Sequence, residues 1–428
     1  MIYLVNAFIL KITLDLSSYY VLAGRYAPFT LTLDLNLGKL VESYCLLTVI
    51  VLAIQAKIHR ISYTVIWLFL IIHYVPLLTV YGLSNESRYW MYSVTLFWLF
   101  VFCIIQIPIK IEPLFARIFI LKETKKNLTF FYFFSFCIIA YAILAFLSAN
   151  NSYLTINFVD IYNLRASLSF NLPLSNYFIN WMGCIIMPFF ISFSMINKKY
   201  LTLGVSICGE ILLFAASGQK TFLLIIPLII VITWRSKSRI ISFSWLALSM
   251  ATIIFLSSMA FYIGETWLTA IFTNRLLILP AVISFQHYDF FSENSPTYLA
   301  HGILKNFVQY PYDTLPWYVI GKLYYGNPHV SANADMISDA YMNFRDFGVF
   351  LLAPLFAISL RLIDGFCRVR DQRLVLSMVL VPLLYSLNTS FLTSILTAGF
   401  GIAILLLYTI PIVAVQKGGR IDFRSKNK

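Results

Sequence analysis

Long apolar runs, separated by short polar segments, fill almost the whole chain. A helix needs about 20 apolar residues to cross the hydrocarbon core of a bilayer, and twelve runs of the sequence approach that length. They occupy approximately residues 2–22, 40–56, 62–81, 89–107, 129–147, 177–196, 200–216, 221–234, 240–263, 347–360, 374–387 and 391–413. The composition, with 60% hydrophobic and 11% charged residues, is also far from that of soluble proteins. We therefore predict an all-α polytopic membrane protein with about 12 transmembrane helices.

The first run contains two charged residues, Lys11 and Asp15. Because they are four positions apart, they share one face of a helix and can neutralise each other inside the bilayer. The alternative is a helix that lies in the membrane interface. No small-residue cleavage site follows the run, so we expect it to be retained rather than removed as a signal peptide.

Lysine and arginine residues are concentrated in alternate loops. Cytoplasmic loops of membrane proteins are enriched in these residues, and the alternation is consistent when both termini are cytoplasmic, including a tail at 414–428. The cations that then fall on the outer side are Arg25, Lys39, Arg88, Arg165, Lys220, Arg275, Lys305, Lys322 and Arg345. Topology thus explains the net charge of +13. We expect no nucleic-acid partner, because such a surface needs cations clustered on one polar face.

Two of the predicted outer loops are long, 148–176 and 264–346. The second contains an apolar stretch at 267–285 and many tyrosine and tryptophan residues. We expect it to form short helices that lie on or dip into the membrane surface, with aromatic side chains at the headgroup level. No internal repeat is evident, so we predict a single integral membrane domain over 1–428 whose site is built from these loops.

Three of the outer cations, Arg165, Lys220 and Arg275, are placed to bind an anion. Lys220 ends the turn Ser217-Gly218-Gln219-Lys220 between two runs that are short for full crossings, so the turn is expected below the membrane surface. Arginine offers a planar fork of donors that suits phosphate oxygens. The alternatives are arginines that extend to lipid headgroups and an internal ion pair between Lys220 and Glu210 that only fixes helix packing.

The densest polar segment of the sequence is 331–348, which runs into the tenth apolar run. Asp335, Asp339 and Asn343 recur every four residues and would share one face of a helix that begins near the start of this segment. That face would present carboxylates at the mouth of the membrane domain. The alternative is that these acids only cap the helix and interact with its dipole.

Metal and nucleotide sites are not indicated. The five histidines lack the spacing of metal ligands, and no phosphate-binding glycine loop or nucleotide motif is present. We therefore expect no metal, no cofactor and no ATP-driven transport.

With these features the chain resembles the O-antigen polymerases, the Wzy-type oligosaccharide repeat-unit polymerases of bacterial surface polysaccharide synthesis. The resemblance covers nearly the whole chain. It rests on the twelve runs, the two long outer loops with Arg165 and Arg275, the turn 217–220 and the segment 333–348. One departure is Arg345, at a position where the family usually has a small residue, most often glycine, before an aromatic-Gly pair.

The resemblance implies a GT-C-like membrane glycosyltransferase of the bacterial cytoplasmic (inner) membrane. Its substrate would be an undecaprenyl-diphosphate-linked oligosaccharide, and the growing chain would pass from its lipid diphosphate to the next repeat unit. The product would be O-antigen or capsular polysaccharide. The implied partners are membrane lipid and a chain-length-regulating co-polymerase.

The resemblance also implies roles for the residues named above. Arg165, Lys220 and Arg275 would bind the diphosphate, and Arg275 would also offset the charge of the leaving group. Asp335, or failing that Asp339, would orient or deprotonate the acceptor hydroxyl.

Two further residues of the polar segment would contact the sugar. The ring of Tyr341 would stack on a sugar face, and Asn343 lies on the same predicted helix face as the acids. Both assignments follow from the resemblance.

Two rival functions remain from the sequence alone. A flippase for the same lipid-linked oligosaccharide would also be a basic protein of about twelve spans, although such transporters usually have short loops and internal repeats. An O-antigen ligase would use the same donor with another acceptor. The related ligases carry a functional histidine near the position of Asp335, and no histidine is close to Asp335 in this sequence.

Overall fold

The computed structural model describes residues 2–26, 29–55, 60–107, 125–157, 160–235, 244–302 and 304–410. Within these ranges the chain is helical and contains no β-strand, apart from one isolated bridge between Asn150 and Ser169. Eleven helices of the described part are long and apolar enough to cross a membrane. The prediction of an all-α polytopic membrane protein is confirmed at this level. The predicted cytoplasmic tail at 414–428 lies outside the described residues.

The long helices follow the predicted apolar runs closely. The runs predicted at 221–234 and 374–387 form α12 (Lys220–Arg235) and α17 (Gln372–Tyr385), which are both shorter than the roughly 20 residues of a full crossing. The helix Thr269–Glu293 has the length and hydropathy of a crossing, although we predicted this segment to be part of an outer loop. The number of crossings therefore depends on the course of these three helices.

The helices of the chain group into two compact units. Unit 1 contains Met1–Ile109, Ser242–Arg361 and Ser386–Ser390, and unit 2 contains Lys110–Ile241, Leu362–Tyr385 and Phe391–Lys428. Each unit is described by itself below. The prediction of a single domain stays a prediction.

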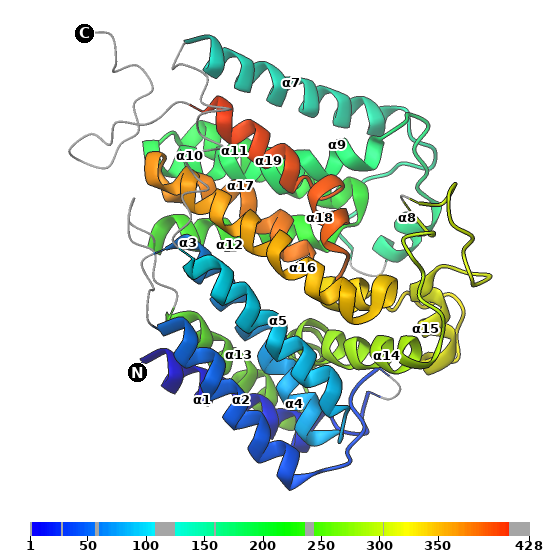
Figure 1. Cartoon of the computed structure of the whole chain (residues 1–428). Helices are drawn as coiled ribbons and strands as arrows, with labels where there is room; N and C mark the ends of the chain where they lie inside the picture. Colours follow the sequence, from blue (N-terminus) through cyan, green and yellow to red (C-terminus); the bar gives the residue numbers. More distant parts are fainter. Residues whose placement is uncertain are drawn as a thin grey trace. The chain divides into compact units, whose positions relative to one another are not determined.

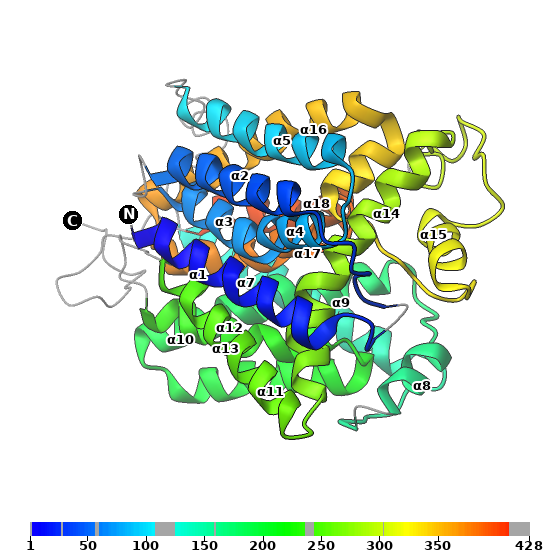
Figure 2. The same ribbon diagram turned by 90° about the horizontal axis from the view of Figure 1, so that it is seen from below.

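Unit 1 is built around one continuous helix formed by α3 (Ile61–Phe69), η2 (Leu70–Tyr74) and α4 (Val75–Leu83). Its residues are apolar with few exceptions, and almost all of them are buried. Helices α1 (Ile2–Ser17), α2 (Leu37–Gln55) and α5 (Arg88–Gln106) pack against α4, and α1, α2 and α4 run side by side (Figures 1 and 2). The other elements of this unit are η1 (Ser18–Leu22), α13 (Ser244–Tyr262), η4 (Thr269–Ile278), α14 (Leu279–Glu293), α15 (Pro316–Tyr325) and the part of α16 (Met336–Val369) up to Arg361.

The two charged residues of the first helix form a buried ion pair. Lys11 Nζ donates hydrogen bonds to both carboxylate oxygens of Asp15, at 3.0 and 2.9 Å. Asp15 also accepts hydrogen bonds from Thr79 Oγ1 (2.6 Å) and Tyr44 Oη (2.7 Å). The prediction that Lys11 and Asp15 neutralise each other is confirmed, and the partners from α2 and α4 satisfy the remaining lone pairs of the carboxylate.

Both ends of the helix Thr269–Glu293 lie near helix ends that we predicted on the outer side of the membrane. Thr269 Oγ1 donates to the carbonyl of Ser257 (2.7 Å), close to the end of α13, which is the outer end of the ninth predicted run. At the other end, Ser292 O accepts from Arg345 (2.8 Å), which precedes the tenth predicted run on its outer side. This arrangement favours the prediction of a helix that dips into the membrane and returns.

Helix α16 is sharply bent at Phe344 and Arg345, where the backbone is not helical. Arg345 has a φ of 52°, in the left-handed region that favours glycine. Gly348 allows the two sides of the bend to approach, because a Cβ atom at this position would lie 2.0 Å from the carbonyl oxygen of Ala340. The bend separates a short polar helix from the apolar remainder of α16.

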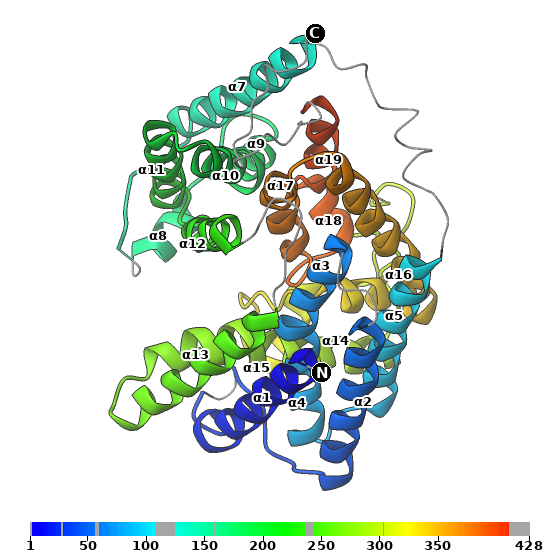
Figure 3. The same ribbon diagram turned by 90° about the vertical axis from the view of Figure 1, so that its left-hand side faces the viewer.

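Unit 2 is built around a second continuous helix, formed by α9 (Ser175–Trp181), η3 (Met182–Ile186) and α10 (Met187–Asn197). Most of its residues are buried, because it packs against α11 (Tyr200–Ser217), α12, α17 and, through α9, α7 (Lys125–Leu147) (Figure 3). The unit also contains α8 (Asp160–Ser167), α18 (Phe391–Leu396) and α19 (Phe400–Thr409). Helix α8 lies in the first long loop and packs against α11.

Candidate functional site

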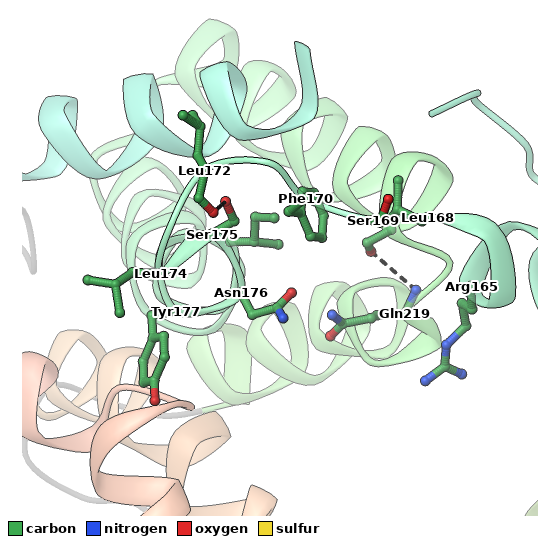
Figure 4. Close-up of a pocket in the computed structure, with 12 residues that line it drawn as sticks. Arg165, Leu168, Ser169, Phe170, Leu172, Leu174, Ser175, Asn176, Tyr177 and Gln219 are labelled. Carbon is green, nitrogen blue, oxygen red and sulfur yellow. Dashed lines mark hydrogen bonds between the residues drawn. The ribbon is translucent and has the colours of Figure 1, made fainter. Parts of the chain in front are cut away.

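A cavity of about 520 Å³ in unit 2 lies between the first long loop and the turn 217–220 (Figure 4). The polar side chains at its wall include those of Arg165, Ser169, Asn176, Tyr177 and Gln219. Within the part of the chain that the structure describes, none of these five side chains forms a hydrogen bond with another residue. A concave site of this size with a few converging polar groups is typical of small-molecule binding.

Arg165 is held at the edge of this cavity by close packing against the turn. Helix α11 ends at Gly218, whose φ of 68° is in the left-handed region. A Cβ atom at Gly218 would lie 2.8 Å from Arg165 Cγ and 3.0 Å from Ile161 Cγ2. Glycine is therefore needed here both for the turn and for the approach of α8. The structure thus brings together Arg165 and the turn that the sequence analysis identified separately.

The other two polar residues near this turn have different environments. Lys220 begins α12, is half-buried and is not part of the cavity wall. Glu210 is fully buried in α11, and neither of its carboxyl oxygens has a hydrogen-bond partner in the described part of the chain. The proposed alternative, a Glu210 to Lys220 pair that fixes helix packing, is therefore not formed.

In unit 1, Asp335 caps the start of α16. Its Oδ1 accepts hydrogen bonds from the backbone N–H groups of Ile337 (2.8 Å) and Ser338 (3.1 Å), and its Oδ2 accepts one from Ser338 Oγ (2.6 Å). The side chain is buried. This is the capping role that the sequence analysis left open beside catalysis. The prediction that Asp335 acts on the acceptor stays a prediction.

The sequence analysis missed the histidine that lies beside Asp335. His73 Nε2 is 3.5 Å from Asp335 Oδ2, and neither ring nitrogen forms a hydrogen bond within the described part of the chain. His73 belongs to η2, a π-helical segment of the kind often found at functional sites. No spacing rule could have linked the two residues, which come from different predicted spans. The sequence has no histidine close to Asp335 along the chain, but His73 lies next to Asp335 in the structure.

The His73–Asp335 pair lies deep in unit 1. His73 precedes the end of α4 at Leu83 by ten residues, which corresponds to about 15 Å along a helix. Asp335 must lie at a similar depth because it contacts His73. An acceptor hydroxyl at the headgroup level would not reach this pair without a rearrangement.

Asn343 connects the polar helix to the second long loop. Its Oδ1 accepts hydrogen bonds from Thr297 Oγ1 and from the backbone N–H of Leu299, both at 2.7 Å, and its Nδ2 donates to the carbonyl of Asp339 (2.8 Å). Asn343 is buried, whereas Asp339, one turn before it, remains partly exposed. Of the three residues on this predicted face, Asp339 has the side chain that is most available to a substrate.

The remaining predicted residues of unit 1 lie in different surroundings. Tyr341 is buried, with its ring centroid 5.3 Å from that of Trp90 and 5.2 Å from that of Tyr288. Arg275 is exposed in the π-helical segment η4. The predicted sugar contacts of Tyr341 and Asn343 and the diphosphate contact of Arg275 stay predictions.

Glu86 is a second acid that the sequence analysis did not identify. It lies in the turn between α4 and α5, and burial together with the nearby Asp289 raises the pKa of Glu86 to about 8, although Lys39 opposes this effect. A carboxyl group that titrates near neutral pH is suited to acid–base catalysis. The sequence shows only a polar turn at this place. The raised pKa could not be predicted from it, because Asp289 belongs to α14, which is far away along the chain.

The predicted site residues thus divide between the two units. Unit 2 holds Arg165 and Lys220 at or near the cavity, and unit 1 holds Arg275, Asp335, Asp339, Tyr341 and Asn343. No protein-family model matches the chain, and the comparisons with curated proteins and with solved structures found no match.

Proposed function

We propose that the protein is a membrane glycosyltransferase that polymerises undecaprenyl-diphosphate-linked oligosaccharide repeat units into O-antigen or capsular polysaccharide. The acceptor hydroxyl would attack the anomeric carbon of the donor sugar. The bond from this carbon to the diphosphate oxygen would break, with its electron pair leaving on the lipid diphosphate.

The cavity of unit 2 is the observation that carries this proposal. Arg165 and the turn 217–220 come from segments about fifty residues apart, and both were identified from the sequence as parts of an anion site. They meet at the wall of one cavity, where the side chains of Arg165, Ser169, Asn176, Tyr177 and Gln219 form no hydrogen bond with another described residue. A lipid-linked oligosaccharide offers both an anion for the arginine and hydroxyl groups for the neutral side chains.

The backbone at Arg345 supports the resemblance on which the proposal rests. The polymerase family usually has glycine at this position, and the φ of 52° at Arg345 is the conformation that glycine adopts most easily. The guanidinium donates hydrogen bonds to the carbonyls of Ser292 (2.8 Å) and Asn294 (3.1 Å), which helps to hold a non-glycine residue in this bend. The departure in residue type therefore does not remove the turn.

In the proposed reaction, Arg165 binds the diphosphate, with Lys220 and Arg275 as further candidates. Asp339 is the better candidate for the acceptor hydroxyl, because Asp339 is a partly exposed residue whereas the carboxylate of Asp335 is occupied by capping hydrogen bonds. The chain-length-regulating co-polymerase and the location in the bacterial cytoplasmic membrane belong to the same proposal.

The proposal is tested by gel analysis of surface polysaccharide from a strain that lacks the gene, before and after complementation. A polymerase deletion is expected to leave lipid A–core capped by a single repeat unit, because transport and ligation remain intact. Long chains should return with the wild-type gene but not with Arg165→Ala, while Lys305→Ala, a charge change elsewhere on the predicted outer side, should restore them. Each variant is compared at equal protein level.

An O-antigen ligase is the second candidate, and the pair of His73 with Asp335 favours it, since a histidine is expected near this position in ligases. The same gel separates the candidates. Core without any repeat unit in the deletion strain would contradict the polymerase and leave the ligase or the flippase. Accumulation of long lipid-linked polymer would then identify the ligase.

A further inference from the structure

The cavity of unit 2 has two chemically different parts. Its charged group, Arg165, lies at the edge, where the exposed guanidinium extends from a stem packed against Gly218. The inner part is neutral, and Figure 4 shows the side chains of Asn176 and Gln219 in the middle of the cavity. An anion and a neutral ligand would therefore occupy different places.

A diphosphate is poorly suited to the inner part. Binding several negative charges requires several cations or many charge-assisted hydrogen bonds, and Arg165 is the only cation among the described residues that line the cavity. The middle of the cavity offers instead the amides of Asn176 and Gln219, while Ser169 and Tyr177 add a hydroxyl and a phenol elsewhere on the wall. Amide and hydroxyl groups both donate and accept hydrogen bonds, as sugar hydroxyls do.

The apolar lining of the cavity is also consistent with a sugar. The ring of Phe170 lies at the wall beside Ser169, and Tyr177 adds an aromatic face together with its hydroxyl group. Such rings can cover the apolar faces of a sugar while amides bind its rim. The volume of about 520 Å³ is within the usual range for a small ligand, which suits a short oligosaccharide.

We propose that this cavity is a saccharide subsite, in which Asn176 and Gln219 bind the sugar hydroxyls next to the diphosphate and Arg165 binds the diphosphate at the edge. The inference rests on the proposed function, because it takes the lipid-linked oligosaccharide as the substrate. It assigns the sugar to unit 2, whereas the sequence analysis assigned sugar contacts to Tyr341 and Asn343.

The test measures binding to the purified full-length protein in nanodiscs. One probe is the repeat-unit oligosaccharide released by mild acid from its lipid diphosphate, and the other is inorganic pyrophosphate. Asn176→Leu and Gln219→Leu should each weaken oligosaccharide binding by about tenfold, as expected for the loss of hydrogen bonds to a neutral ligand. Arg165→Gln should weaken pyrophosphate binding by at least the same factor and change oligosaccharide binding by less than about threefold.

The controls separate a specific loss from misfolding. Asn163→Leu changes an exposed residue of α8 outside the cavity wall and should leave both affinities unchanged. Retained pyrophosphate binding in Asn176→Leu and Gln219→Leu shows that these variants are folded. The proposal is overturned if both leucine variants bind the oligosaccharide like the wild type, if the wild type does not bind it, or if Arg165→Gln alone abolishes its binding.

These outcomes are distinct from a failure of the proposed function. Oligosaccharide binding that depends on Asn176 and Gln219, together with long polysaccharide chains in the deletion strain, would keep the saccharide subsite and reject the polymerase. Short products in the deletion strain without such binding would keep the polymerase and reject the subsite.

Discussion

Asp335 and Asp339 are one helical turn apart and differ in what their carboxylates can do. Asp335 is buried and accepts three hydrogen bonds from the first turn of α16, whereas Asp339 is partly exposed. Asparagine caps a helix about as well as aspartate, so Asp335→Asn should retain most of the polymerisation activity. Asp339→Asn should reduce it by about 10²-fold or more if its carboxylate acts on the acceptor proton. Both are compared by the length distribution of surface polysaccharide at equal protein level.

Because Asp335 caps a helix, its variants can also be compared by their stability. Asp335→Ala removes the cap and should lower the free energy of unfolding by about 1 kcal/mol, with a lower melting temperature than Asp335→Asn. Loss of activity in Asp335→Asn with an unchanged melting temperature would restore Asp335 as the acid–base candidate and reject Asp339 for that role.

The raised pKa of Glu86 makes a prediction about pH. Burial and the nearby Asp289 raise the pKa of its carboxyl group from the ordinary value of 4.5 to about 8 in the folded protein. Between about pH 4.5 and 8 the folded state thus keeps this proton, whereas the unfolded state releases it. The free energy of unfolding therefore falls as the pH rises through this window. Above pH 8 both states are deprotonated, and the group causes no further loss of stability. Glu86→Gln stays neutral and should melt a few degrees higher than the wild type at pH 8, with little difference at pH 5.

The exposed acid Glu265 provides the matched control for this measurement. Glu265→Gln should not show a stabilisation that grows between pH 5 and pH 8. An equal gain for Glu86→Gln and Glu265→Gln would attribute the effect to the overall charge of the outer surface, and no gain at pH 8 would reject the raised pKa.

Residue contacts were predictable from the sequence where the partners are close along one helix. Lys11 and Asp15 share a helix face, so their pairing follows from their spacing. His73 and Asp335 meet only because two helices far apart in the sequence pack together, and Glu86 depends in the same way on Asp289. Pairings of this kind depend on tertiary packing, which a single sequence does not encode locally.

At the scale of elements, the turn after α11 makes a sharp prediction about Arg165. Gly218→Ala should move α8 and Arg165 away from the cavity, because the new Cβ would lie 2.8 Å from Arg165 Cγ. Gly326→Ala is the matched control, since Gly326 has nearly the same φ (67°, against 68°) and no atom within 4 Å of an added Cβ. Both variants carry a similar backbone strain of about 1 kcal/mol, so Gly218→Ala should show the larger loss of long polysaccharide. Equal effects would mean that only the strain matters.

The apolar runs predicted the helices well, because a helix in a bilayer must satisfy its backbone hydrogen bonds internally and therefore needs a continuous apolar stretch. The interruptions within helices were not predictable in this way. The π-helical segments η2 and η3 lie inside predicted apolar runs, and their residue types do not distinguish them from the α-helical parts on either side. The bend of α16 occurs at an arginine, which a reading of local backbone preferences would place in a regular helix.

At the scale of the whole molecule, hydropathy and charge establish the class of the protein but not its crossing number. The helix Thr269–Glu293 illustrates why, since its hydropathy is sufficient for a crossing while its two ends lie near the predicted outer ends of neighbouring helices. Length and composition measure whether a helix can cross, whereas its packing against neighbours decides whether it does.

The course of this helix decides on which side of the membrane the rest of the second long loop lies. Cysteine labelling tests whether the residues before and after the helix lie on the same side. In a variant without the native cysteines, Glu265→Cys and Ser295→Cys, which are exposed before and after the helix, should both react in intact cells with a maleimide that does not cross the inner membrane. Lys199→Cys, in a predicted cytoplasmic loop, should react only after the membrane is opened. If Glu265→Cys reacts from outside and Ser295→Cys does not, the helix crosses. The segment that leads into Asp335 would then be cytoplasmic, and Asp335 and Asp339 could not act on a repeat unit at the outer face.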